Sequence, residues 1–261
     1  MTWTTQPRSE RHGMAAIVAG EGPLVLLLHG VGLRAEAWAR IQTHLAAGWE
    51  VVAPDMPGHG LSAHQPGMEA LEDYARVLRP LMERPCHLVG HSMGAMLALR
   101  LASDVPSRVL SVTALNGIFE RKEGAKLAVR ARADHLDGQT VPDPGPALDR
   151  WFGKTSSPER MACETWLREV DPAGYRSAYR VFAREDGPSR DQLAQLTCPA
   201  LFITGGQEPN STPAMSRAMA ALCPKGQAEV LEDAAHMLPM THADQLAPIL
   251  THFLQHTTPK P

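Results

Sequence analysis

The stretch "VGHSMGA", Val89 to Ala95, decides how the rest of the sequence is interpreted. It places Ser92 between Gly90 and Gly94, after the apolar run "CHLVG" and before the apolar run "MLALRLA". Where a strand turns sharply into a helix, the central residue is strained and the residues two before and two after it lie close together, which favours glycine at both. The pattern therefore predicts a strand-turn-helix elbow that holds the Ser92 hydroxyl at the helix N-terminus.

Five short apolar runs recur along the chain without a regular alternation of apolar and polar residues. Such runs indicate strands that are buried on both faces, as in a mainly parallel sheet. Segments with helical spacing, such as "AEAWARIQTHLA" and "ALEDYARVLRPLME", lie between them, and this order is typical of a doubly wound α/β fold. The runs cover residues 24–28, 49–53, 86–90, 109–115 and 200–204.

The alternation stops after "LNG" at 115–117 and resumes near "LTCPALFITGG". The segment between contains helical stretches such as "KEGAKLAVRARADHL" and "GYRSAYRVFARED", and it is too long to be a simple loop. We therefore expect an α/β core made of residues 1–117 and 195–261. Residues 118–194 are expected to form a helical cap inserted after strand 6.

The composition excludes several classes of function. The chain has 261 residues, a formal net charge of -3 and a pI near 6.5, so it offers no strong positive field for nucleic acid or an anionic membrane. Its first residues, "MTWTTQPRSERHG", lack the apolar core of a signal peptide, and no run is long enough to span a bilayer. We expect a cytoplasmic protein that acts on a small molecule, without nucleic-acid or membrane partners; the oligomeric state is not readable from the sequence.

The cysteines are widely separated and form neither a Cys-x-x-Cys motif nor a zinc-type pairing with histidine. We therefore expect buried free thiols, no metal site and no cofactor. The four positions are Cys86, Cys163, Cys198 and Cys223.

A serine hydroxyl is a weak nucleophile near neutral pH and needs a base that is oriented by a carboxylate. In a fold of this kind the acid and then the histidine are expected after later strands. The stretch "EVLEDAAHMLPMTHADQL" places His236 in a turn after a short strand, and "ALFITGGQEPNSTP" places Glu208 just past another strand. The competing acids are Glu232, Asp233 and Asp186, and the competing histidines include His242 and His256.

The reaction also requires two donors for a developing oxyanion. The run "LVLLLHGVG" ends in a turn where Gly30 and Gly32 allow close approach of the backbone. We assign the donors as the backbone N–H groups of Val31 and of Met93, the residue after Ser92. His29 is expected to brace this loop.

Together, "HGVG", "DMPGHGLS" (55–62), "GHSMG", "TGGQEPNSTP" and "DAAHMLP" resemble the α/β-hydrolase family over nearly the whole chain. Glu208 departs from that pattern, because aspartate is usual there. Within the family, "DRWFGK" (149–154) and "DPAGYRSAYRVFA" (171–183) resemble the helical cap of the 3-oxoadipate enol-lactonase group. That resemblance implies small acidic substrates with an ester, lactone or enol-derived acyl group.

The expected cap contains residues suited to substrate binding. Arg121 and Arg150 are candidates for capturing a substrate carboxylate, because arginine does this in a bidentate manner; the alternative is that both are solvated surface charges. Aromatic residues could line the pocket or hold the helical layer together. The candidates are Trp151, Phe152, Trp166, Tyr175, Tyr179 and Phe182, of which Trp151 and Tyr179 are preferred as substrate contacts.

These features predict a serine hydrolase in which Ser92 attacks a carbonyl, His236 relays the proton and Glu208 orients His236. The same triad also supports hydrolysis of a carbon–carbon bond, or of an amide or enamide bond in a ring-cleavage product. A small-molecule receptor that retains the fold is the alternative from another class. A haloalkane dehalogenase or an epoxide hydrolase of the same fold is disfavoured, because its nucleophile would be aspartate at position 92.

Overall fold

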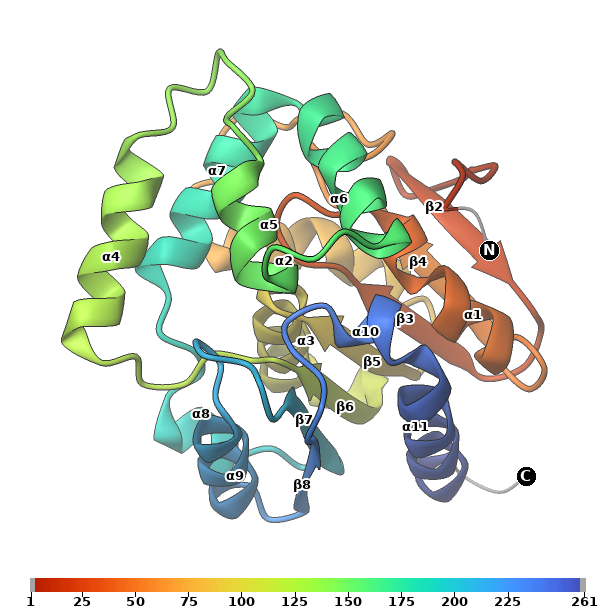
Figure 1. Ribbon diagram of the computed structural model, residues 1–261. Coiled ribbons are helices and arrows are strands. Elements are labelled where there is room, and N and C mark those ends of the chain that lie inside the picture. The colour runs from red at the N-terminus through yellow and green to blue at the C-terminus, as the bar shows by residue number, and fades with distance from the viewer. Residues whose placement is uncertain (1–2, 259–261) are drawn as a thin grey trace.

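In the computed structural model, which describes residues 3–258, eight strands form one sheet in the order β1-β2-β4-β3-β5-β6-β7-β8 (Figure 1). From β4 to β8 all neighbouring strands are parallel, whereas β1–β2 and β2–β4 are antiparallel. The expected mainly parallel sheet is therefore confirmed. The strands are β1 Ser9–Arg11, β2 Met14–Ala19, β3 Leu24–Leu28, β4 Glu50–Pro54, β5 Cys86–His91, β6 Val109–Leu115, β7 Ala200–Gly205 and β8 Gly226–Leu231.

The sheet is covered on both faces, which explains the apolar runs without alternation. Successive residues of β3 face opposite sides, so Leu26 packs into one apolar core and Leu27 into the other. On the Leu26 side lie α2 (Leu71–Leu78), α3 (Met93–Asp104), α8 (Arg190–Ala194) and α9 (Pro213–Leu222). On the Leu27 side lie η1 (Ala35–Trp38), α1 (Ala39–Leu45), α10 (Leu238–Thr241) and α11 (Ala243–Thr257). Two short 3-10 turns follow α2 and α3: η2 (Arg79–Leu81) and η3 (Pro106–Arg108).

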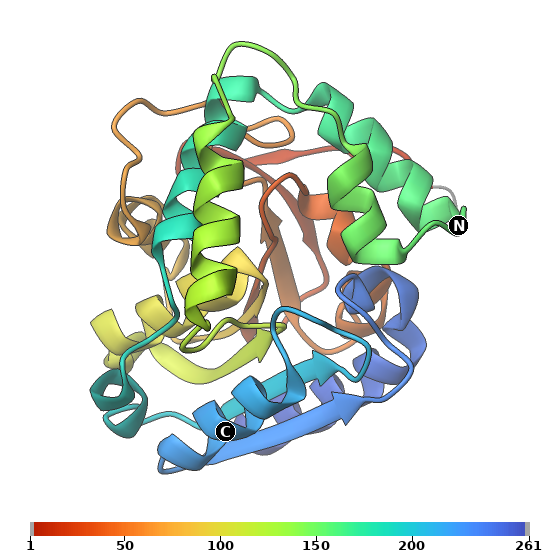
Figure 2. The same cartoon turned by 60° about the vertical axis from the view of Figure 1, so that its left-hand side comes forward.

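Four further helices follow β6 and form a separate layer at one end of the sheet (Figures 1 and 2). Two of them begin with a capping residue followed by proline: the Ser157 side chain accepts from the backbone N–H of Arg160, and Asp171 accepts from that of Gly174. The helices are α4 Glu123–Asp134, α5 Gly145–Phe152, α6 Pro158–Glu169 and α7 Pro172–Arg184. The next helix, α8, lies within residues 118–194 but packs beside α9 rather than in this layer.

Backbone contacts hold this layer against the loops of the core. A Cβ at Gly58 would overlap the Cα of Gly174, and a Cβ at Gly174 would lie 2.5 Å from the Cα of Gly58, so only glycine permits this approach of a loop to α7. The hydroxyl of Ser177, also on α7, donates to the carbonyl of Met68 at 2.9 Å. The start of α7 is therefore fixed to the core.

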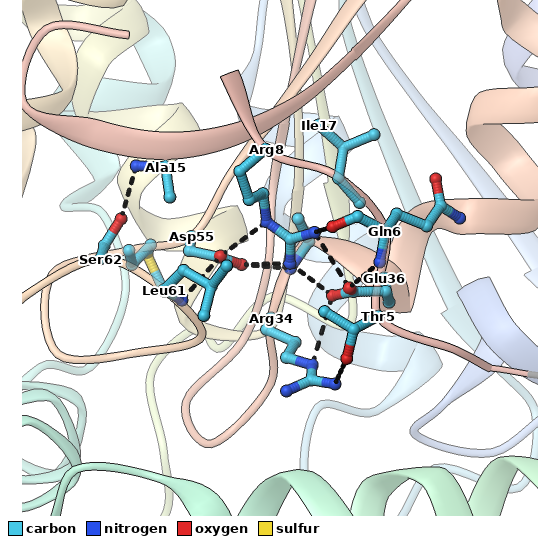
Figure 3. A network of polar contacts seen from close by, with 12 residues as sticks. Thr5, Gln6, Arg8, Ala15, Ile17, Arg34, Glu36, Asp55, Leu61 and Ser62 are labelled. Carbon is cyan, nitrogen blue, oxygen red and sulfur yellow. Dashed lines mark hydrogen bonds and ion pairs between the residues drawn. The ribbon is translucent and has the colours of Figure 1, made fainter. Parts of the chain in front are cut away.

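An arginine near the N-terminus joins three segments that are distant in sequence (Figure 3). Arg8 Nη2 lies 2.6 Å from Glu36 Oε2, and Arg8 Nε lies 2.8 Å from Asp55 Oδ2; all three side chains are buried. Asp55 also accepts from the backbone N–H groups of Ala35 and Leu61. Burial alone would raise the pKa of Asp55, but these hydrogen bonds outweigh it and hold that pKa below its usual value.

All four cysteines are buried and unpaired, as expected from their spacing. Within residues 3–258, no helix combines the length and the apolar character needed to cross a membrane.

We expect Arg8→Met to lower the free energy of unfolding by about 3–5 kcal/mol, because it leaves the buried Asp55 carboxylate without its cation and leaves Glu36 with Arg34 alone. Urea denaturation followed by circular dichroism measures this loss. The matched control is Arg190→Met, which removes an arginine paired with Glu120 on the exposed surface and is expected to change stability little. Equal stability of the two variants would contradict the role given to Arg8.

Candidate active site

The turn between β5 and α3 has the geometry of the elbow expected from "GHSMG". Ser92 has φ 57 and ψ -117, a left-handed backbone that is strained for a residue with a side chain. A Cβ at Gly90 would overlap the carbonyl of Gly94, and a Cβ at Gly94 would overlap the carbonyl of Leu28. Both glycines are therefore required by the close packing of the helix on the strand, which holds Ser92 at the first turn of α3.

His236 lies in the turn after β8, and its ring contacts the expected acid. Its Nδ1 is 2.7 Å from Glu208 Oε2, and because a carboxylate accepts, Nδ1 carries the proton and Nε2 remains free to accept one. Glu208 Oε1 accepts from the backbone N–H groups of Asn210, at 2.8 Å, and Ser211, at 3.3 Å. Burial alone raises the pKa of Glu208, but His236 and these N–H groups outweigh it, so that pKa lies below its ordinary value.

The competing residues have other partners or positions. Asp233 is exposed and lies beside Gln245 and His242, while Asp186 pairs with Lys126 and Arg121. His242 is the residue before α11. Among the acids weighed from the sequence, the described structure brings only Glu208 to His236.

Two backbone N–H groups are available beside Ser92. Met93 is the first residue of α3, so its N–H has no partner within the helix, and within residues 3–258 neither Met93 nor Val31 donates its N–H to another protein group. The loop containing Val31 is braced by His29, which accepts from the N–H of Met56 on Nε2 and therefore donates from Nδ1 to the carbonyl of Gly30. One cavity is therefore lined by the Ser92 hydroxyl and the His236 imidazole, and His236 is hydrogen-bonded to the Glu208 carboxylate.

A cavity lies between these core loops and the helices α4, α5 and α7. Its empty space, including the part open to solvent, is about 810 Å³. It is lined by Val31, Ser92, Asn116, Ile118, Arg121, Ala125, Val129, Arg132, Ala147, Arg150, Trp151, Tyr175, Tyr179, Phe182, Asn210, Ser211 and His236.

The two candidate arginines differ in their surroundings. Arg121 is buried, so the alternative of a solvated surface charge is wrong for it; its guanidinium donates to the carbonyls of Phe182 and Glu185 at the end of α7 and lies over the Phe182 ring. Arg150 is partly buried in the cavity wall and makes no hydrogen bond or ion pair with any residue in the described range. The guanidinium of Arg121 therefore binds the C-terminal end of α7, while that of Arg150 has no partner among the described residues.

The aromatic candidates also separate into two groups. Trp151 lies nearly parallel to the imidazole of His236, with ring centroids 6.0 Å apart and an interplanar angle of 19°. Tyr179 lines the cavity and accepts from Arg132 Nε at 3.0 Å. Tyr175 and Phe182 line the cavity as well, whereas Phe152 and Trp166 are not among its lining residues and instead pack in the apolar core.

Four polar residues of the cavity were not singled out from the sequence: Asn116, Arg132, Asn210 and Ser211. Arg132 was identifiable, since Ala125, Val129 and Arg132 follow one another at helical spacing and share one face of α4. Asn116 lies in the "LNG" stretch, which in the sequence indicates only the end of a strand and not part of a site. Its partners come from two other loops, so no local pattern marks it.

We expect Glu208→Gln to slow the reaction of Ser92 with a fluorophosphonate by about 10⁴-fold, because the amide no longer holds the required imidazole tautomer. The rate of covalent labelling, followed by mass spectrometry, measures this effect. Asp233→Asn is the matched control and should label at the unaltered rate. If instead Asp233→Asn is slow and Glu208→Gln is normal, the acid has been assigned wrongly.

Comparisons with known proteins agree with the observed fold. A family model described as "Alpha/beta hydrolase family" matches residues 25–249. The chain is 36% identical over 252 residues to an (E)-2-((N-methylformamido)methylene)succinate hydrolase of Acinetobacter baylyi, covering 92% of this chain and 93% of that protein. The fold is similar to that of an esterase from Thermogutta terrifontis, with a TM-score of 0.84, 24% identity and coverage of 97% and 99%.

An enol-lactonase from Burkholderia xenovorans LB400 has the same fold, with a TM-score of 0.81, 22% identity and coverage of 95% of this chain and 100% of the other. At this level of identity the likeness concerns the fold. The family match covers most of the chain, and the relative from Acinetobacter baylyi matches it over nearly its whole length. The chain therefore belongs to the alpha/beta hydrolase family.

Proposed function

We propose that this enzyme is a serine hydrolase that cleaves an ester, lactone or related acyl bond of a small carboxylate-bearing metabolite. The observation that carries the proposal is a single cavity lined by Ser92, His236 and the unpaired Arg150, while none of the described residues that line it is an aspartate or a glutamate. A cavity with this charge favours an anionic substrate, since arginine binds carboxylates through paired, charge-assisted hydrogen bonds.

In the proposed reaction, Ser92 Oγ attacks the acyl carbon while His236 Nε2 takes the hydroxyl proton. The N–H groups of Val31 and Met93 donate to the oxyanion, and Glu208 stabilises the imidazolium. The bond to the leaving group then breaks, and the leaving group takes the proton from His236. A water molecule, deprotonated by His236, attacks the acyl-Ser92 ester and releases the acid product and the free serine.

Substrate binding is assigned to residues 118–194, which we propose to act as a cap over Ser92. Arg150 is the primary carboxylate ligand in this proposal, because its guanidinium has no protein partner within the described chain. Trp151 follows it directly on α5 and covers one face of His236. Tyr179 and Arg132, which are hydrogen-bonded to each other, also line the cavity, and Arg121 holds the end of α7.

A second candidate is hydrolysis of an enamide. The relative from Acinetobacter baylyi is named for a succinate that carries an N-methylformamido group on a methylene carbon. Such a compound has two carboxylates, and the cavity of this chain has the guanidinium groups of Arg132 and Arg150 in its wall. The same residues would transfer the formyl group to Ser92 Oγ, and the nitrogen would leave as an enamine that takes its proton from His236.

We expect Ser92→Ala to lower kcat by about 10⁶-fold on every substrate that the enzyme hydrolyses, as loss of a triad nucleophile does. Ser103→Ala is the matched control, since Ser103 lies on the same helix and only donates to the carbonyl of Leu99. The substrates to test are p-nitrophenyl esters, enol-lactones, the methylenesuccinate enamide and meta-cleavage diketones. Hydrolysis by Ser92→Ala at a rate near that of the unaltered enzyme would sink the proposal.

We expect Arg150→Met to reduce kcat/KM about 10- to 100-fold for a substrate with a carboxylate, because a charge-assisted hydrogen bond is lost. The reduction should be absent for a neutral ester with the same acyl group. Steady-state kinetics on the two substrates measure the difference, with Arg168→Met on the exposed side of α6 as the control. An equal effect on both substrates would show that Arg150 does not select for charge.

A further inference from the structure

The backbone carbonyl of His236 is held from two sides by buried side chains. Asn116 Nδ2 donates to it at 2.7 Å, and His91 Nε2 lies 2.8 Å from it. A carbonyl only accepts hydrogen bonds, so both nitrogens are donors. Burial, and then the neighbouring His236, lower the pKa of His91 to about 3, so His91 donates as a neutral imidazole. The loop of the expected base is therefore fixed by groups next to Ser92 and at the end of β6.

The other half of the Asn116 amide reaches the strand that precedes the acid. Asn116 Oδ1 accepts from the backbone N–H of Gly205 at 3.2 Å and lies 2.9 Å from Thr204 Oγ1. Both residues end β7, and the turn that follows leads to Glu208, whose N–H donates back to Gly205. One buried amide thus links the loop of the acid to the loop of the base.

The residue type at position 116 is restricted in two independent ways. Its φ is 48, in the left-handed region that asparagine tolerates better than most residues with a side chain. Its side chain must also donate on one side, to His236, and accept on the other, from Gly205. Aspartate has the same shape and tolerates the same backbone, but it cannot donate when ionised.

We propose that Asn116 is a positioning residue that sets the orientation of the His236 imidazole toward both Glu208 and Ser92. This inference rests on the proposed function, in which His236 is the base. The Asn116 amide would thus affect catalysis through the position of His236, and not only the stability of the fold.

The test replaces Asn116 with Asp and with Gly and measures the rate of Ser92 phosphonylation by a fluorophosphonate as a function of pH. In Asn116→Asp the donor to the His236 carbonyl is lost and a negative charge is added, which favours the imidazolium form of His236. The labelling rate should fall about 100-fold, as for a catalytic group displaced by about 1 Å. The acid limb of the pH profile should move to higher pH, because the base acts only when it is deprotonated.

Asn116→Gly keeps the left-handed backbone at no steric cost, so it remains foldable if the aspartate variant is not. It should also label slowly, but without the shift of the acid limb, because no charge is added. The other titratable or charged groups around His236 are Glu208, His91, Arg150 and Arg132, and both variants retain them.

Ser111→Ala is the matched control, because Ser111 lies on β6, the strand that leads to Asn116, and its hydroxyl contacts His87 rather than the site. It should label at the unaltered rate with the unaltered pH profile. Unaltered rates and pH profiles in both Asn116 variants would overturn the inference while leaving the serine mechanism intact. A lack of labelling at Ser92 in the unaltered enzyme would overturn the proposed function and this inference together.

Discussion

The site depends on backbone packed directly against backbone at the turn between β5 and α3. Neither Gly90 nor Gly94 has room for a side chain, so the strand, the helix and the end of β3 meet more closely than larger residues would allow. This contact forces Ser92 into a left-handed backbone. It also places the loop after β3 beside the first turn of α3, so that two unpartnered N–H groups come from neighbouring segments. A single steric constraint therefore shapes both the backbone of Ser92 and its surroundings.

A glutamate at position 208 is accommodated by the turn that carries it. One carboxylate oxygen is held by the N–H groups of Asn210 and Ser211, which leaves the other for His236. Although glutamate is one methylene longer than aspartate, the carboxylate of Glu208 is therefore held in place by the backbone of its own loop. Asn116 ties the same loop to the far side of His236, so acid and base are fixed relative to each other by two separate contacts.

The parts of the structure that follow from local pattern could be predicted from the sequence. Five of the six parallel strands, β3 to β7, were evident as apolar runs because strands covered on both faces are mostly apolar, and the end of the sixth, β8, was placed near Leu231. Ser92, His236 and Glu208 were evident because each follows a recognisable strand. Strands β1 and β2, which form the antiparallel edge of the sheet, were both missed, and β1 is short, polar and largely exposed. The roles of Arg121 and Asn116 depend on partners at Glu185 and His236, more than sixty residues away, so no neighbouring residues reveal them.

The contact between Gly58 and Gly174 anchors α7 to the core, whereas α4 packs on α7 and α5 packs on α6. The residues proposed to select the substrate, Arg132 and Arg150, therefore stand on helices that rest on other helices and not on the sheet. Exchange of residues 123–152 would replace these side chains while leaving the loops that carry Ser92 and His236 unchanged in sequence, and among the ring contacts of His236 it would replace that of Trp151. In this fold the residues proposed for catalysis and those proposed for substrate selection therefore lie on different segments, which can change independently.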